Sequence, residues 1–192
     1  RAMWNLLTGW VVDADDNTNN RFDVAARLNA RIGDGPGPFW GCPPSRRTPT
    51  LTSTKVDPQP LEEWRRVEHE LRRGGRRPFS AWQLLGAGSV GSQSLLGIPR
   101  LARLERSLVS GGRTVDVWPF TAEGDPMSDV VIAEVWPSLY TLPALAGRVR
   151  DEVQVIETAR LLAAHVRFAG IGSLEKGPRR AVLDEEGWVL GA

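Results

Sequence analysis

The amino-acid sequence predicts a mixed α/β (α+β) domain, because helical and strand patterns alternate along a chain of globular composition. Apolar residues recur at helical spacing in residues 61–73 and 153–166. β-Branched and aromatic residues cluster in residues 114–120 and 130–136, as they do in strands. The chain has 192 residues, of which 41% are hydrophobic and 24% are charged, and this composition excludes wholesale disorder. We therefore expect a single domain over residues 1–192.

The first part of the chain is expected to contain a helix followed by a long loop. Asn19 or Asn20 is placed to cap a helix that ends at the glycine- and proline-rich run 33–38. The buried stripe of this helix would consist of Val24, Ala25, Leu28 and Ile32. Residues 33–60 are rich in proline and glycine, so we predict an irregular loop, and loops of this length commonly carry function.

Helices and strands follow in the rest of the chain. Residues 61–73 form the clearest helix, with one apolar face made of Leu61, Trp64, Val67 and Leu71. Another helix is expected to begin at Pro99, because proline is favoured at the first helical position, and to end at Gly111. The two strands and the helix over residues 153–166 come next, and residues 180–192 are predicted to form a C-terminal hairpin.

Charge and cysteine content narrow the possible partners. Lys and Arg number 24 against 23 Asp and Glu, so no global field attracts the chain to nucleic acid or to a membrane. The single cysteine, Cys42, excludes an internal disulfide and a cysteine-based zinc cage. The sequence has no apolar run near the ~18 residues that span a bilayer, and residues 1–7 lack the apolar region of a secretory signal. We expect a cytoplasmic protein with no membrane partner.

Two motifs match known ligand-binding patterns, and each has a simpler structural interpretation. Asp13, Asp15 and Asn17 have the spacing of calcium-loop ligands. Val24 stands where a bidentate glutamate closes such a site, so we favour a capped turn. Residues 86–91 read G-x-G-x-x-G, the dinucleotide fingerprint, which needs a buried strand before it and a helix after it. The segment before it lacks β-branched residues, so we favour a glycine-rich turn.

Ser89 raises the alternative of a serine hydrolase. It lies in a sequence one residue away from the G-x-S-x-G elbow, and Asp116 or Asp129 and then His165 follow in the chain order of that class. His165 falls at the end of a predicted helix, where a capping histidine is commoner than a catalytic base. A domain of this length also leaves little room for the hydrolase sheet.

Arginines concentrate between Arg65 and Arg77, beside Trp64. Such a patch can contact phosphate, although glutamates in the same segment favour a solvated and ion-paired helix face. The candidate substrate-binding residues are Arg21, Arg65, Arg72 and Arg76.

Two carboxylates have positions suited to metal binding. Glu134 lies within the predicted strand 130–136, and Asp151 opens the following helix, where a simpler role is that of an N-cap. A strand glutamate and a helix-start aspartate can meet at one edge of a sheet. Such a pair can hold a divalent cation that activates water against a phosphodiester.

Several longer segments, taken in chain order, have a family resemblance. They are NTNNRF (17–22), GPFWG (37–41), WQLLGAGSVGSQ (82–93), VWPF (117–120), EVWPSL (134–139), DEVQ (151–154) and EEGW (185–188). This series resembles an uncharacterised bacterial family assigned an RNase H-like fold, some of whose members have been labelled molybdopterin-guanine dinucleotide biosynthesis proteins.

The resemblance implies an RNase H-like three-layer domain, with helices flanking a sheet and acidic residues binding Mg²⁺ or Mn²⁺. Glu134 matches the strand carboxylate of the family, and Asp151 matches the aspartate that opens its late helix. The family also has an earlier strand with a first ligand aspartate, placed before a segment that resembles Trp4–Val12. Since the sequence begins at Arg1, we expect a sheet that is truncated or rearranged at its N-terminus, or completed by a homodimer.

The leading functional prediction is a divalent-metal-dependent phosphoester or phosphodiester hydrolase. Glu134 and Asp151 would be its catalytic and metal-binding residues, and its ligand would be a phosphate-containing small molecule or a nucleic acid. The main alternative is a non-catalytic binding or structural domain with an incomplete site, and the second alternative is a serine hydrolase using Ser89.

Overall fold

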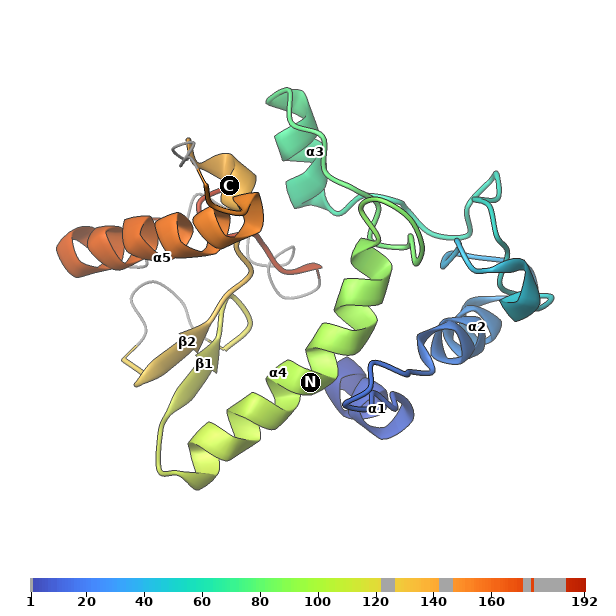
Figure 1. Cartoon of the computed structure of the whole chain (residues 1–192), viewed down its shortest axis with the longest axis horizontal. Coiled ribbons are helices and arrows are strands. Elements are labelled where there is room, and N and C mark those ends of the chain that lie inside the picture. The colour runs from blue at the N-terminus through green and yellow to red at the C-terminus, as the bar shows by residue number, and fades with distance from the viewer. Residues whose placement is uncertain (1, 122–126, 142–146, 171–173, 175–185) are drawn as a thin grey trace. The chain divides into compact units, whose positions relative to one another are not determined.

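The computed structural model describes residues 2–121, 127–141, 147–170, 174 and 186–192. The described part of the chain combines helices with a small parallel sheet, so the prediction of a mixed α and β fold is confirmed (Figure 1). The chain divides into two compact units, an N-terminal unit, Arg1–Ser107, and a C-terminal unit, Leu108–Ala192. The expectation of a single domain over residues 1–192 stays a prediction.

The N-terminal unit is built from helices joined by irregular segments. Its helices are α1 (Ala2–Trp10), α2 (Arg21–Ile32), the 3-10 turn η1 (Pro44–Arg46), α3 (Arg66–Arg73) and α4 (Val90–Ser110), whose last residues belong to the C-terminal unit. The helix expected after Asn20 is confirmed as α2, and Gly33 ends it by donating its N–H to the carbonyl of Asn29 at 3.1 Å.

Two helix starts differ from the sequence prediction. α3 begins at Arg66 rather than at residue 61, because the Glu68 carboxylate folds back to accept the N–H of Arg65 at 2.8 Å and fixes the first turn there. α4 begins at Val90, so Pro99 lies inside the helix instead of starting it. An interior proline removes the hydrogen bond of its own nitrogen, and the full burial of Pro99 offsets part of that cost.

The core of the N-terminal unit draws on α1, α2, the proline-rich loop and α4. Its buried members are Leu7, Val11, Val24, Ala25, Leu28, Phe39, Cys42, Leu51, Leu84 and Leu95. The predicted stripe of α2 is therefore confirmed except at Ile32, which is 41% exposed. Residues 33–60 are irregular as expected, but three of their side chains are core members, so the loop folds as part of the unit rather than over it.

The C-terminal unit contains the sheet. β1 (Val115–Val117) pairs in parallel with β2 (Val130–Ile132), with Val115 opposite Val130 and Val117 opposite Ile132. Both strands are shorter than predicted. β1 ends at a turn in which the N–H of Thr121 donates to the carbonyl of Val117 at 2.9 Å. The 3-10 turn η2 (Pro137–Leu139) follows and contacts α5 (Arg150–Ala169), the helix expected over residues 153–166.

Two further sequence predictions concern the end of the chain and membranes. The first strand of the predicted hairpin, residues 181–183, lies outside the described residues. Among the helices that are described, none combines the length and the apolar content that crossing a bilayer requires.

Candidate functional site

Glu134 lies two residues beyond the end of β2. Its backbone forms a parallel bridge with Val189, and its carbonyl accepts the N–H of Leu190 at 2.9 Å. The prediction that Glu134 lies inside a strand is wrong. β2 ends at Ile132, and Glu134 pairs with residues 189–190 instead of with β1. The side chain of Glu134 is exposed, so its carboxylate does not bear the cost of burial that a strand interior would impose.

Asp151 is the second residue of α5 and is also exposed. Val149 occupies the N-cap position, and no side chain caps the helix there, so the N-cap interpretation of Asp151 is wrong. A carboxylate in the first turn is still favoured by the helix dipole. Its neighbour Glu152 is different, because it accepts a hydrogen bond from Arg148 at 2.6 Å.

The two carboxylates belong to the same unit, and the chain between them contains η2, which contacts α5. Within the described ranges, no group of three or more His, Cys, Asp or Glu side chains is placed to hold a metal ion. Two exposed carboxylates remain a suitable donor set for Mg²⁺, which commonly binds through one or two carboxylates and completes its shell with water and substrate phosphate.

The residues of the serine-hydrolase alternative lie in different units. Ser89 immediately precedes α4 in the N-terminal unit, and its carbonyl accepts the N–H of Gln93 at 3.2 Å. In the C-terminal unit, Asp116 accepts the hydroxyl of Thr121 at 3.0 Å. Asp129 accepts the backbone N–H and the hydroxyl of Thr114 at 2.8 and 3.0 Å. The triad stays a prediction.

The glycine-rich segment 86–91 has structural reasons for its glycines. Gly86 and Gly88 have positive φ angles of 96° and 74°. A Cβ on Gly91 would lie 2.8 Å from the carbonyl oxygens of Ala81 and Gln83, so α4 packs too closely there for a side chain. The N–H of Gly91 donates to Gln83 at 2.9 Å, which occupies an amide that a dinucleotide phosphate would need.

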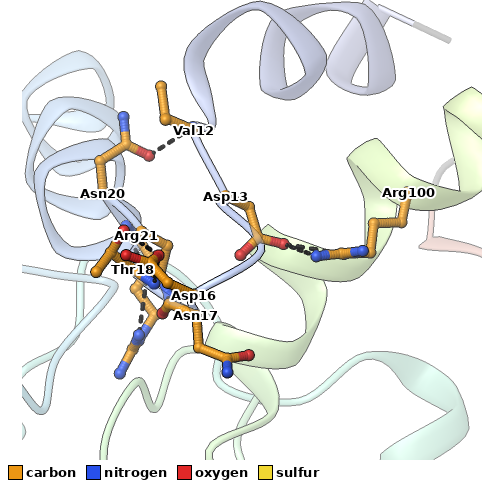
Figure 2. Close-up of polar contacts among 9 residues, drawn as sticks. Val12, Asp13, Asp16, Asn17, Thr18, Asn20, Arg21 and Arg100 are labelled. Carbon is orange, nitrogen blue, oxygen red and sulfur yellow. Dashed lines mark hydrogen bonds and ion pairs between the residues drawn. The ribbon is translucent and has the colours of Figure 1, made fainter.

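Asp13, Asp16, Asn17 and Thr18 lie in a hydrogen-bonded turn, which Figure 2 shows. Arg100 donates hydrogen bonds from Nε and Nη2 to Asp13 Oδ2, at 2.9 and 2.5 Å. The hydroxyl and then the backbone N–H of Thr18 hold the pKa of Asp16 below its ordinary value. Asn20 does not cap α2 with its side chain, because its amide accepts the N–H of Val12 at 2.8 Å and donates to the carbonyl of Trp10 at 2.9 Å.

Two of the candidate substrate-binding arginines are engaged within the fold. Arg21 donates to Asn19 Oδ1 at 2.7 Å, and its guanidinium lies 4.5 Å from the centre of the Phe22 ring. Arg65 donates to Glu68 at 2.6 Å, which reinforces the first turn of α3. Both arginines therefore have structural partners where the sequence suggested phosphate contacts.

Arg72 and Arg76 lie beside a surface hollow. With Gly75 and Arg77 they line a hollow of about 430 Å³ just after α3. The guanidinium of Arg72 lies 4.7 Å from the centre of the Trp64 ring. The structure thus brings two of the predicted arginines together around one surface depression.

Comparisons of the chain with protein-family models, curated proteins and solved structures found no match. The resemblance to an RNase H-like family stays a prediction.

Proposed function

We propose that this protein is a divalent-metal-dependent phosphoester or phosphodiester hydrolase, with Glu134 and Asp151 as ligands of Mg²⁺ or Mn²⁺. One observation carries the proposal. The exposed Glu134 lies two residues after a parallel strand, and the chain then forms η2, which contacts the helix that holds Asp151 in its first turn. Part of the proposal is an RNase H-like arrangement, with the sheet completed by a further strand or by a second copy of the chain.

The positions of the two carboxylates suit the chemistry. In open α/β sheets, ligands bind outside the carboxyl ends of the strands, and Glu134 follows the carboxyl end of β2. The start of α5 favours negative charge, so Asp151 can face a cation without distorting the helix. A bound divalent ion supplies Lewis-acid polarisation of a phosphoryl group and activation of water.

A second candidate is a non-catalytic domain that binds a phosphate-containing ligand. The observation that favours it is that the residues described by the structure contain no group of three or more His, Cys, Asp or Glu side chains placed to hold a metal ion. Such a domain would bind its ligand without turnover, and binding to the native state would raise the unfolding temperature.

Turnover and metal binding measured on the same sample separate these candidates. We expect hydrolysis of bis(p-nitrophenyl) phosphate that requires Mn²⁺ or Mg²⁺ and stops with EDTA. Calorimetric titration with Mn²⁺ should show a matching binding event. Binding of a phosphate ligand without turnover supports the second candidate, and a protein that neither binds Mn²⁺ nor turns over the reporter contradicts the hydrolase.

A further inference from the structure

The chain reverses direction immediately after α3 and carries arginines around the turn. Gly74 and Gly75 follow the helix, and Gly75 has a positive φ of 79°. The N–H groups of Gly74, Gly75 and Arg76 donate to the carbonyls of Glu70, Arg72 and Leu71 at 3.0, 3.0 and 2.9 Å. This turn satisfies carbonyls at the end of the helix that would otherwise repel an anion. It also brings Arg76 and Arg77 to the hollow that Arg72 lines.

Three carboxylates of this segment, Glu63, Glu68 and Glu70, are paired with cations that do not line the hollow. Glu68 binds Arg65 at 2.6 Å, and Glu70 binds Arg73 at 2.6 Å. Glu63 forms an ion pair with Lys55. The sequence suggested that these glutamates would dilute the basic patch, but they are directed to other partners. The ion pairs that these three glutamates form therefore do not involve the arginines that line the hollow.

Arg72 is held in a geometry that suits phosphate. Its guanidinium lies 4.7 Å from the centre of the Trp64 ring, in a cation–π contact. A stacked guanidinium keeps its N–H groups at its edge, where they can donate to two oxygens at once. Because the stacking already restricts the side chain, less conformational entropy is lost when an anion binds.

The volume of the hollow fits a small ligand, and its charged side chains indicate that the ligand is an anion. About 430 Å³ lies within the range of roughly 300–1,000 Å³ that is typical of small-molecule sites. All the charged side chains that line it in the described structure are arginines, the residue best matched to phosphate oxygens.

We propose that the hollow lined by Arg72, Gly75, Arg76 and Arg77 binds the phosphate or diphosphate group of a small organic ligand. The site lies in the N-terminal unit, whereas the metal-binding carboxylates lie in the C-terminal unit. The inference therefore goes beyond the proposed hydrolase and does not depend on a metal ion.

The test is calorimetric titration of the full chain with inorganic diphosphate, at low salt and with EDTA present so that the metal site does not contribute. We expect saturable binding that Arg72→Ala and Arg77→Ala each weaken about tenfold or more. Arg72→Lys should also weaken binding, because an ammonium keeps the charge but not the two-pronged contact. Arg103→Ala removes the same charge from an exposed position of α4 in the same unit and should leave the affinity unchanged.

Circular dichroism of each variant establishes that α3 is intact, and a short single-stranded oligonucleotide serves as the second ligand. The proposal is overturned if the wild-type chain does not bind diphosphate, or if Arg103→Ala weakens binding as much as Arg72→Ala. It is also overturned, in favour of a nucleic-acid backbone, if the oligonucleotide binds through these arginines and diphosphate does not. If the chain binds diphosphate but shows no metal-dependent turnover, the proposed hydrolase function is contradicted and the phosphate site is not.

Discussion

Asn29 of α2 and Phe39 of the following loop exchange two hydrogen bonds through a side-chain amide. Asn29 Nδ2 donates to the Phe39 carbonyl and Oδ1 accepts the Phe39 N–H, both at 2.9 Å. Nδ2 also donates to the carbonyl of Thr50 at 2.7 Å. Asn29 is fully buried, so this one side chain fixes both arms of the proline-rich loop to α2, as a neighbouring strand would.

Replacing this amide should destabilise the N-terminal unit strongly. Asn29→Ala leaves the buried N–H and carbonyl of Phe39 without their partners, and we expect the free energy of unfolding to fall by about 3 kcal/mol. The measurement is urea denaturation followed by tryptophan fluorescence. Asn5→Ala, at an exposed position of α1, should change stability by less than about 0.5 kcal/mol. Equal effects of the two variants would contradict the role of Asn29.

Two glycines of α4 should respond in opposite directions to the same substitution. A Cβ on Gly91 would meet carbonyl oxygens of Ala81 and Gln83 at 2.8 Å, whereas one on Gly97 would meet nothing within 4 Å. Gly97→Ala should therefore stabilise the protein by about 0.5–1 kcal/mol through helix propensity. Gly91→Ala should lower the melting temperature, because backbone has to move to accommodate the methyl group. Scanning calorimetry of both variants checks this, and a stabilising Gly91→Ala would show that the close approach is absent.

Sequence periodicity predicted the elements whose packing is local. The stripe of α2 and the apolar spacing of α5 identify those helices, and the β-branched runs identify both strands. The start of α4 was missed because Gly97 and Pro99 are both unfavourable within helices. Burial of Pro99 in the folded unit offsets part of that cost, and burial is a tertiary property that no local sequence pattern reports.

The candidate site was less predictable, because its geometry depends on contacts between distant residues. The sequence identifies Glu134 as an acid near a strand, but its bridge to Val189 joins segments that no local pattern connects. One signal was available for the loop. Asn29 follows Leu28 on the buried side of α2, and a polar residue at such a position predicts that its amide has buried partners.

The carboxylate of Asp129 should make the stability of the C-terminal unit sensitive to acid. The backbone N–H of Thr114, and then its hydroxyl, hold the pKa of Asp129 below its ordinary value of 3.8. The folded state therefore favours the ionised form, and its contribution to stability is fully present above about pH 4. That contribution is lost as the pH falls through the lowered pKa of the folded state.

Titration by NMR of the wild-type protein and of Thr114→Val measures this effect. Valine removes the hydroxyl donor but keeps the backbone N–H, so the pKa of Asp129 should rise part of the way toward its ordinary value. Asp129→Asn should in turn make unfolding less dependent on pH in the acid range. An unchanged titration of Asp129 in Thr114→Val would show that the hydroxyl does not stabilise the carboxylate.

The metal site can be tested by removing each proposed ligand in turn. The control is Glu152→Gln, which changes the carboxylate next to Asp151 in α5. Glu134→Gln and Asp151→Asn remove the proposed ligands, so each should lower metal-dependent turnover by about a hundredfold or more. Even residues that only support metal ligands typically cost 10–100-fold when mutated. Glu152→Gln alters the next residue of the same turn, whose carboxylate is bound to Arg148, and should leave turnover and Mn²⁺ affinity unchanged. All three side chains are exposed, so the melting temperatures should agree closely with that of the wild type. Full turnover in Glu134→Gln, or an equal loss of Mn²⁺ affinity in Glu152→Gln, would assign the ion to another part of the protein.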